Sequence, residues 1–192
     1  MTQVRVLAFA GSARAASLNK RLLRVAADAV AAAGAEVTVV DLDDYALPVY
    51  HGDLEAREGM PANARTLREM FLAHGALLVA SPENNGSISA LLKNTLDWIS
   101  RPVGGRNGLV PYQGKVAALV AASPGGIGGV RGLAHLRAIL ERLGVLVLPE
   151  QFALPRAHEA FTGDGALAEP RHRAAVAGLA RRLVEVSGRL AG

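Results

Sequence analysis

Hydroxyl, amide and cationic side chains gather directly after the first apolar run of the chain. Residues 4–10 are mostly apolar, and Gly11 opens the stretch that follows. The residues that we expect to bind a ligand there are Ser12, Arg14, Ser17, Leu18 and Asn19. A turn between a strand and a helix can bind a phosphate dianion through N–H groups at the helix N-terminus. Several hydrogen bonds to a charged group, about 1.5–3 kcal/mol each, can anchor a nucleotide. Ser17 alone could equally be only the helix cap.

A second polar turn follows the apolar run over residues 76–80. Pro82 removes a backbone donor and ends the strand, while the Asn-Gly pair after it permits positive φ. Ser87 predicts the N-cap of a helix that begins at Ile88 and continues with apolar residues at helical spacing. This order is typical of a ligand site at the carboxyl edge of a sheet. The residues that we expect to bind the ligand are Pro82, Glu83, Asn84, Asn85, Gly86 and Ser87.

A third turn follows the apolar run over residues 115–122 and contains four glycines within residues 123–129. Its spacing fails the G-x-G-x-x-G dinucleotide pattern, because Arg131 stands where the third glycine would be. Four glycines exceed what a tight turn requires, so we favour close approach of the backbone to a ligand. The residues that we expect to contribute are Ser123, Gly125 and Gly126.

The elements that position these turns alternate between strands and helices. We predict strands over residues 4–10, 35–42, 76–80, 115–122 and 145–149. Helical patterns begin near residues 18, 61, 88, 130 and 168, and long loops cover residues 43–59 and 101–114. The apolar runs lack alternation, which indicates strands buried on both faces of a parallel sheet. We therefore predict one α/β domain over residues 1–192.

The first two turns resemble the signatures of the NADPH-dependent FMN reductase family. Residues 11–19 read G-S-A-R-A-A-S-L-N, similar to the phosphate loop G-S-x-R-x-x-S-x-N of that family. Residues 82–98 resemble its P-E-Y-N-G-S…L-K-N…D-W signature, with Asn84 where the family usually has tyrosine. With the order of elements, the resemblance covers nearly the whole chain.

This resemblance implies a flavodoxin-like three-layer fold with strand order 2-1-3-4-5. In that order the first, third and fourth strands are neighbours, so the three turns meet at one crevice. It also implies bound FMN, hydride transfer from NADPH, a quinone-like or other small electron acceptor, and assembly as a homodimer or homotetramer. The cofactor carries such chemistry, so we assign no side chain as a catalytic acid or base.

Composition disfavours several other functions. No cysteine is present, so redox chemistry would depend on a bound cofactor. Aromatic residues make up only 4% and the arginines are scattered, which disfavours nucleic-acid binding. The five histidines show no metal-binding spacing, and we predict no metal site. No run approaches the roughly 18 apolar residues of a membrane span, and no signal-peptide pattern is visible, so we expect a cytoplasmic protein.

Three alternatives stay open from the residues alone. The chain could be an electron carrier or flavin-binding module without NADPH turnover, although flavodoxins tend to be acidic and this net charge is +4. Trp98 could serve a subunit contact or the core. Asp41 and its acidic neighbours could bind a metal or a ribose, but turn and capping roles are better supported.

Overall fold

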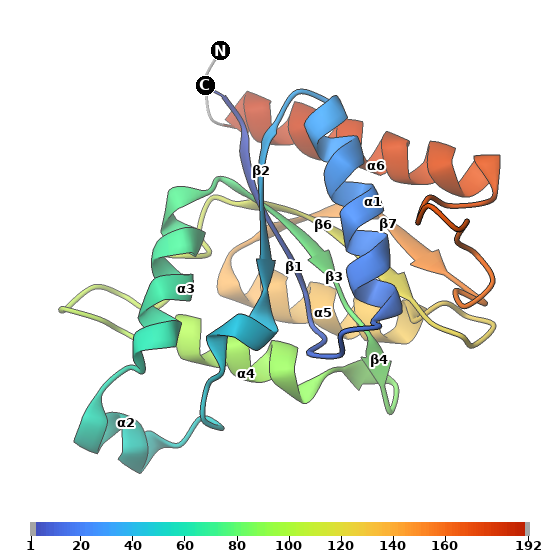
Figure 1. Cartoon of the computed structure of the whole chain (residues 1–192). Helices are drawn as coiled ribbons and strands as arrows, with labels where there is room; N and C mark the ends of the chain where they lie inside the picture. The colour runs from blue at the N-terminus through green and yellow to red at the C-terminus, as the bar shows by residue number, and fades with distance from the viewer. Residues whose placement is uncertain (1–2, 191–192) are drawn as a thin grey trace.

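Five parallel strands form the centre of the computed structural model, which describes residues 3–190 (Figure 1). The strands are β1 (Arg5–Ala10), β2 (Glu36–Asp41), β3 (Ala76–Ala80), β6 (Val116–Ala122) and β7 (Leu146–Leu154). Their order is β2-β1-β3-β6-β7, and each neighbouring pair is parallel. Counted within this sheet, the order is 2-1-3-4-5, which confirms the predicted flavodoxin-like topology.

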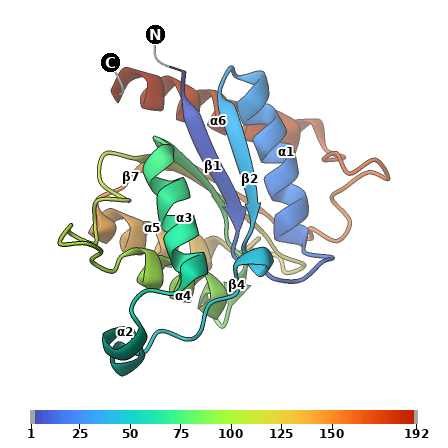
Figure 2. The ribbon, with the colours of Figure 1, turned by 60° about the vertical axis from the view of Figure 1, so that its left-hand side comes forward.

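Helices cover both faces of the sheet, as Figures 1 and 2 show. One face carries α1 (Leu18–Ala32) and α6 (Pro170–Leu190). The other carries α3 (Ala62–Ala73), α4 (Ala90–Ile99) and α5 (Val130–Leu143). These are the three layers that the family resemblance implied.

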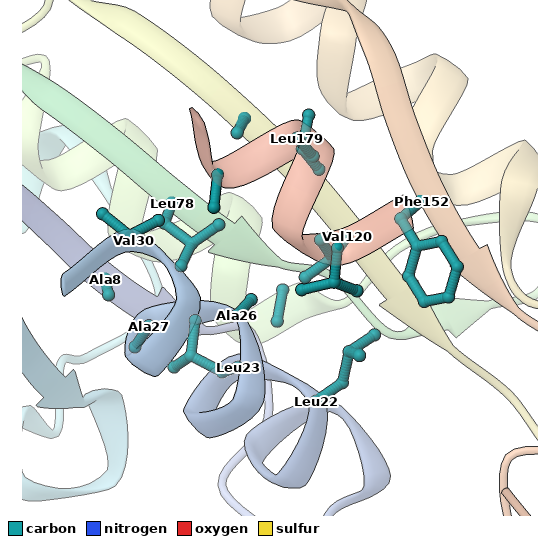
Figure 3. Packing of buried hydrophobic residues seen from close by; sticks show 14 of the residues in the cluster. Ala8, Leu22, Leu23, Ala26, Ala27, Val30, Leu78, Val120, Phe152 and Leu179 are labelled. Carbon is teal, nitrogen blue, oxygen red and sulfur yellow. The ribbon is translucent and has the colours of Figure 1, made fainter. Parts of the chain in front are cut away.

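The two cores follow from the alternation of side chains along each strand. Val6, Ala8 and Ala10 belong to the core beneath α1 and α6, whereas Leu7 and Phe9 belong to the opposite one. Figure 3 shows Leu22, Ala26 and Val30 of α1 beside Leu78 and Val120 of the sheet. Every residue of β3 and β6 is buried. Their unbroken apolar runs are thus the consequence of burial on both faces, each large side chain contributing about 1.5–3 kcal/mol.

The helix after the second turn begins later than predicted. Glu83–Asn84 and Ser87–Ile88 form a small antiparallel hairpin, β4 and β5, and α4 starts only at Ala90. Asn85 and Gly86 both have positive φ, 51° and 78°, as a two-residue hairpin turn requires. Ser87 is therefore a strand residue, and the predicted cap at this position is wrong. The N-cap is Ser89, whose side chain accepts a hydrogen bond from the N–H of Leu92.

Two further boundaries differ from the prediction. The predicted loop over residues 43–59 contains a 3-10 helix η1 (Leu42–Tyr45) and the short helix α2 (Gly52–Glu58). Strand β7 continues to Leu154 instead of ending at Pro149, because a register irregularity lets it resume pairing at Gln151. Proline and polar residues near the irregularity concealed the second half of this strand.

The second part of the family signature serves packing. Trp98 is fully buried, and its indole N–H donates to the carbonyl oxygen of Pro48 at 2.7 Å. The side chain of Asn94 donates to the same carbonyl at 3.0 Å and accepts from the N–H of Tyr50 at 2.8 Å. Trp98 is therefore a core residue, and with Asn94 it fixes the segment before α2. No helix within residues 3–190 is long and apolar enough to cross a bilayer.

Candidate functional site

A cleft of about 440 Å³ lies where the ends of β1, β3 and β6 meet. All three predicted turns contribute to its wall. The predicted residues that line it are Ser12, Arg14, Ser17, Leu18, Asn19, Pro82, Glu83, Asn84 and Ser123. The structure does not place five others in the wall, namely Asn85, Gly86, Ser87, Gly125 and Gly126. The sequence reasoning had not singled out several lining residues, above all Ser89, Ala90, Leu91 and Pro124.

The first turn leaves backbone donors and a cation without partners among residues 3–190. Ser17 caps α1 by accepting from the N–H of Lys20 at 3.3 Å, which confirms the capping role that the sequence left as an alternative. A role of Ser17 in ligand binding stays a prediction. The N–H groups of Leu18 and Asn19 have no hydrogen-bond partner among the described residues. Arg14 is exposed, and its guanidinium makes no ion pair with any residue that the structure describes. Free N–H groups at a helix N-terminus beside an unpaired cation attract a phosphate.

Asn19 joins the first turn to the third. Its Nδ2 donates to the carbonyl oxygen of Ala122 at 2.9 Å, and the N–H of Ala122 donates to its Oδ1 at 2.9 Å. Asn19 is buried, and these two bonds occupy both ends of its amide. Its side chain therefore links two walls of the cleft, and its backbone N–H has no partner within residues 3–190.

A lysine that the sequence reasoning missed supports the same turn. Lys20 is buried, and its Nζ lies 2.6 Å from Oδ2 of Asp41 and 3.5 Å from the carbonyl oxygen of Ala13. Burial by itself would raise the pKa of Asp41, but the hydrogen bond and charge of Lys20 lower it. Asp41 also caps η1 by accepting from the N–H of Asp43 at 3.1 Å. The capping role expected for this aspartate is confirmed.

Helix α5 holds the hairpin of the second turn. The carboxylate of Glu83 accepts from the N–H of Gly132 at 3.1 Å and pairs with Arg131 at 2.7 Å. Burial would raise the pKa of Glu83, yet these two donors lower it, so the carboxylate stays ionised. On the other strand of the hairpin, Oγ of Ser87 lies 2.9 Å from Nδ1 of His135. The hairpin is thus fixed with Glu83 and Asn84 on the cleft wall.

The glycines of the third turn fall into two groups. Gly128 and Gly129 have positive φ, and a Cβ on Gly128 would lie 2.8 Å from the backbone of β7. Gly125 and Gly126 have neither constraint, because their φ is not positive and an added Cβ would meet nothing closer than 3.4 Å. The fold itself therefore requires glycine only at Gly128 and Gly129. Close approach of a ligand remains the prediction for Gly125 and Gly126.

The missed residues carried a local signal. Ser89 directly precedes an apolar helical run and is as good a cap as Ser87, and the Asn-Gly pair is the strongest short hairpin signal. Together, the cap at Ser89 and the Asn-Gly hairpin turn predict a helix that starts at Ala90, with its first turn at the cleft.

Comparisons with known proteins agree on one family. The family model described as NADPH-dependent FMN reductase matches residues 4–159. An NAD(P)H-dependent FMN reductase of Pseudomonas aeruginosa is 35% identical over 171 residues, which is 88% of each chain. A quinone reductase of Escherichia coli K12 is 33% identical over 147 residues, 76% of this chain and 74% of the relative.

A solved structure is similar along its whole length. FerB, a flavoenzyme NAD(P)H:(acceptor) oxidoreductase from Paracoccus denitrificans, superposes with a TM-score of 0.80 at 28% identity. The alignment covers 97% of this chain and 98% of that one.

Proposed function

The chain belongs to the NADPH-dependent FMN reductase family, and we propose that it binds FMN in the cleft between its three turns. The proposed activity is an NAD(P)H oxidoreductase that reduces a quinone-like or other small acceptor. The observation that carries the proposal is the convergence of the N-terminus of α1 and two further turns on one cleft. Bound FMN would supply the two-electron redox chemistry between a nicotinamide and a second substrate.

The phosphate end of the cleft fits this group. The N–H groups of Leu18 and Asn19 have no partner in the described chain, and Ser12 and Arg14 line the same wall. Hydrogen bonds of this charged type contribute about 1.5–3 kcal/mol each. The volume of about 440 Å³ falls within the range of small-molecule sites. We propose that these four residues bind the phosphate.

The other end of the cleft has the chemistry that a flat ring system requires. Pro82 and Asn84 come from the second turn, Ser123 and Pro124 from the third, and Leu91 from the first turn of α4. Pro82, Leu91 and Pro124 offer apolar surface to the ring, while Asn84 and Ser123 offer polar atoms to its edge. Because Asn84 replaces the family tyrosine with a smaller side chain, we propose that it widens the entrance for the acceptor.

Among the residues that line the cleft, Glu83 is the one carboxylic acid. Glu83 is ionised and committed to Gly132 and Arg131, so it is not a proton donor near neutral pH. We therefore propose that the side chains bind and orient the cofactor and do not transfer protons. The family resemblance also implies a homodimer or homotetramer, which stays a prediction.

The test is a visible spectrum of the purified protein reconstituted with FMN, followed by anaerobic addition of NADPH or NADH. We expect a flavin spectrum that bleaches rapidly with at least one nicotinamide and recovers on addition of a quinone. A flavin-loaded protein that resists both nicotinamides would instead be an electron carrier, and failure to bind FMN would reject the proposed function altogether.

A further inference from the structure

Three side chains attach the first turn to neighbouring parts of the structure. We propose that Ser89, Lys20 and Asn19 are positioning residues that preorganise residues 11–19 for the phosphate of the flavin. The proposal rests on the FMN function proposed above. It assigns to these side chains an action on the turn and not on the phosphate itself.

Ser89 fixes the start of the turn. Its Oγ donates to the carbonyl oxygen of Gly11 at 2.6 Å and accepts from the N–H of Leu92 at 3.1 Å. The serine is buried, although it reaches the wall of the cleft. A Cβ on Gly11 would lie 2.8 Å from Cβ of Leu92, so the turn is also in close contact with α4 at this point. One hydroxyl thus caps a helix and anchors the turn.

Lys20 and Asn19 complete the attachment. The ammonium of Lys20, held by Asp41 at 2.6 Å, lies 3.5 Å from the carbonyl oxygen of Ala13. The amide of Asn19 fixes the far end of the turn through its two 2.9 Å bonds to Ala122. Between these attachments, residues 13–16 are exposed.

In this arrangement two carbonyl oxygens of the turn accept hydrogen bonds from side chains, whereas two of its N–H groups stay available to a ligand. Carbonyl oxygens repel an anion, and the donors from Ser89 and Lys20 occupy those of Gly11 and Ala13. The N–H groups of Leu18 and Asn19 are left without a partner in the described residues. A turn already fixed in this state loses little conformational freedom when the phosphate binds, which is the gain from preorganisation.

Comparing FMN with riboflavin isolates this effect, because the two ligands differ only by the phosphate. We would measure both dissociation constants by calorimetric titration of the native chain, Ser89→Ala and Ser89→Gly. Alanine removes the cap and the bond to Gly11 together, whereas glycine is tolerated at an N-cap and removes chiefly the bond. Ser100→Ala is the matched control, because its Oγ donates to the carbonyl of Asp97 at the other end of α4.

We expect both Ser89 variants to lose the preference for FMN over riboflavin by about tenfold, which equals about 1.4 kcal/mol. The riboflavin affinity of the two Ser89 variants should stay near the native value. Ser100→Ala should keep the native preference for FMN over riboflavin. An unchanged preference, or an equal loss of both ligands, would overturn the positioning role while leaving the FMN function standing. A native chain that binds neither ligand would overturn the proposed function and this inference with it.

Discussion

At the residue scale, some charged side chains are buried, and removing a charge from water costs free energy. The buried Lys20 has a carboxylate partner, because its Nζ lies 2.6 Å from Oδ2 of Asp41. Lys115 differs, because it is buried and, among the described residues, its Nζ donates only to the backbone carbonyl of His74. This burial lowers the pKa of Lys115 to about 8.

The lowered pKa predicts how stability depends on pH. Above about pH 8 the folded state releases the Lys115 proton while the unfolded chain, with a pKa of 10.5, retains it. The free energy of unfolding should therefore rise with pH from about 8 to 9.5, with a slope of at most about 1.4 kcal/mol per unit. Urea denaturation at several pH values measures it.

Two variants decide whether Lys115 is responsible. Lys115→Met should abolish the rise, whereas Lys93→Met, on the exposed face of α4 beside Asp97, should retain it. An identical pH dependence in the native chain and Lys115→Met would contradict the account.

At the element scale, the site depends on how closely the turn after β1 approaches α4. A Cβ on Gly11 would lie 2.8 Å from Cβ of Leu92, both of which belong to tightly packed parts of the structure. Gly11→Ala should lower the free energy of unfolding by about 1–3 kcal/mol through overpacking. Chemical denaturation of the two proteins at neutral pH tests this.

Gly75→Ala is the control for that experiment. An added Cβ at Gly75 meets nothing within 4 Å and its φ is not positive. Its effect should stay within about 0.5 kcal/mol. Equal losses in the two variants would show that the loss of glycine, and not contact with α4, determines stability.

Sequence patterns predicted the elements better than their connections. The apolar runs of β3 and β6 identified buried parallel strands because burial on both faces leaves no polar positions. The hairpin before α4 was missed because Ser87 and Ser89 are equally good caps, and only pairing of Glu83 with Ile88 distinguishes them. Strand β7 was cut short because its irregularity contains Pro149, which usually marks a strand end.

At the scale of the whole molecule, strand order is what brings the turns together. Residues 12, 82 and 123 are far apart in the chain, yet β1, β3 and β6 are neighbours, so their carboxyl ends share one edge. The topology was expected from the family resemblance, and with it the location of the cleft. The bonds of Ser89, Lys20 and Asn19 could not be predicted, because each joins elements whose distance depends on tertiary packing.

A crystal structure of the protein with FMN tests the central claim most directly. We expect the phosphate within hydrogen-bonding distance of the N–H groups of Leu18 and Asn19. We expect the ring between the second and third turns, beside Pro82 and Pro124. FMN bound elsewhere, or lying in the cleft with its phosphate away from α1, would contradict it.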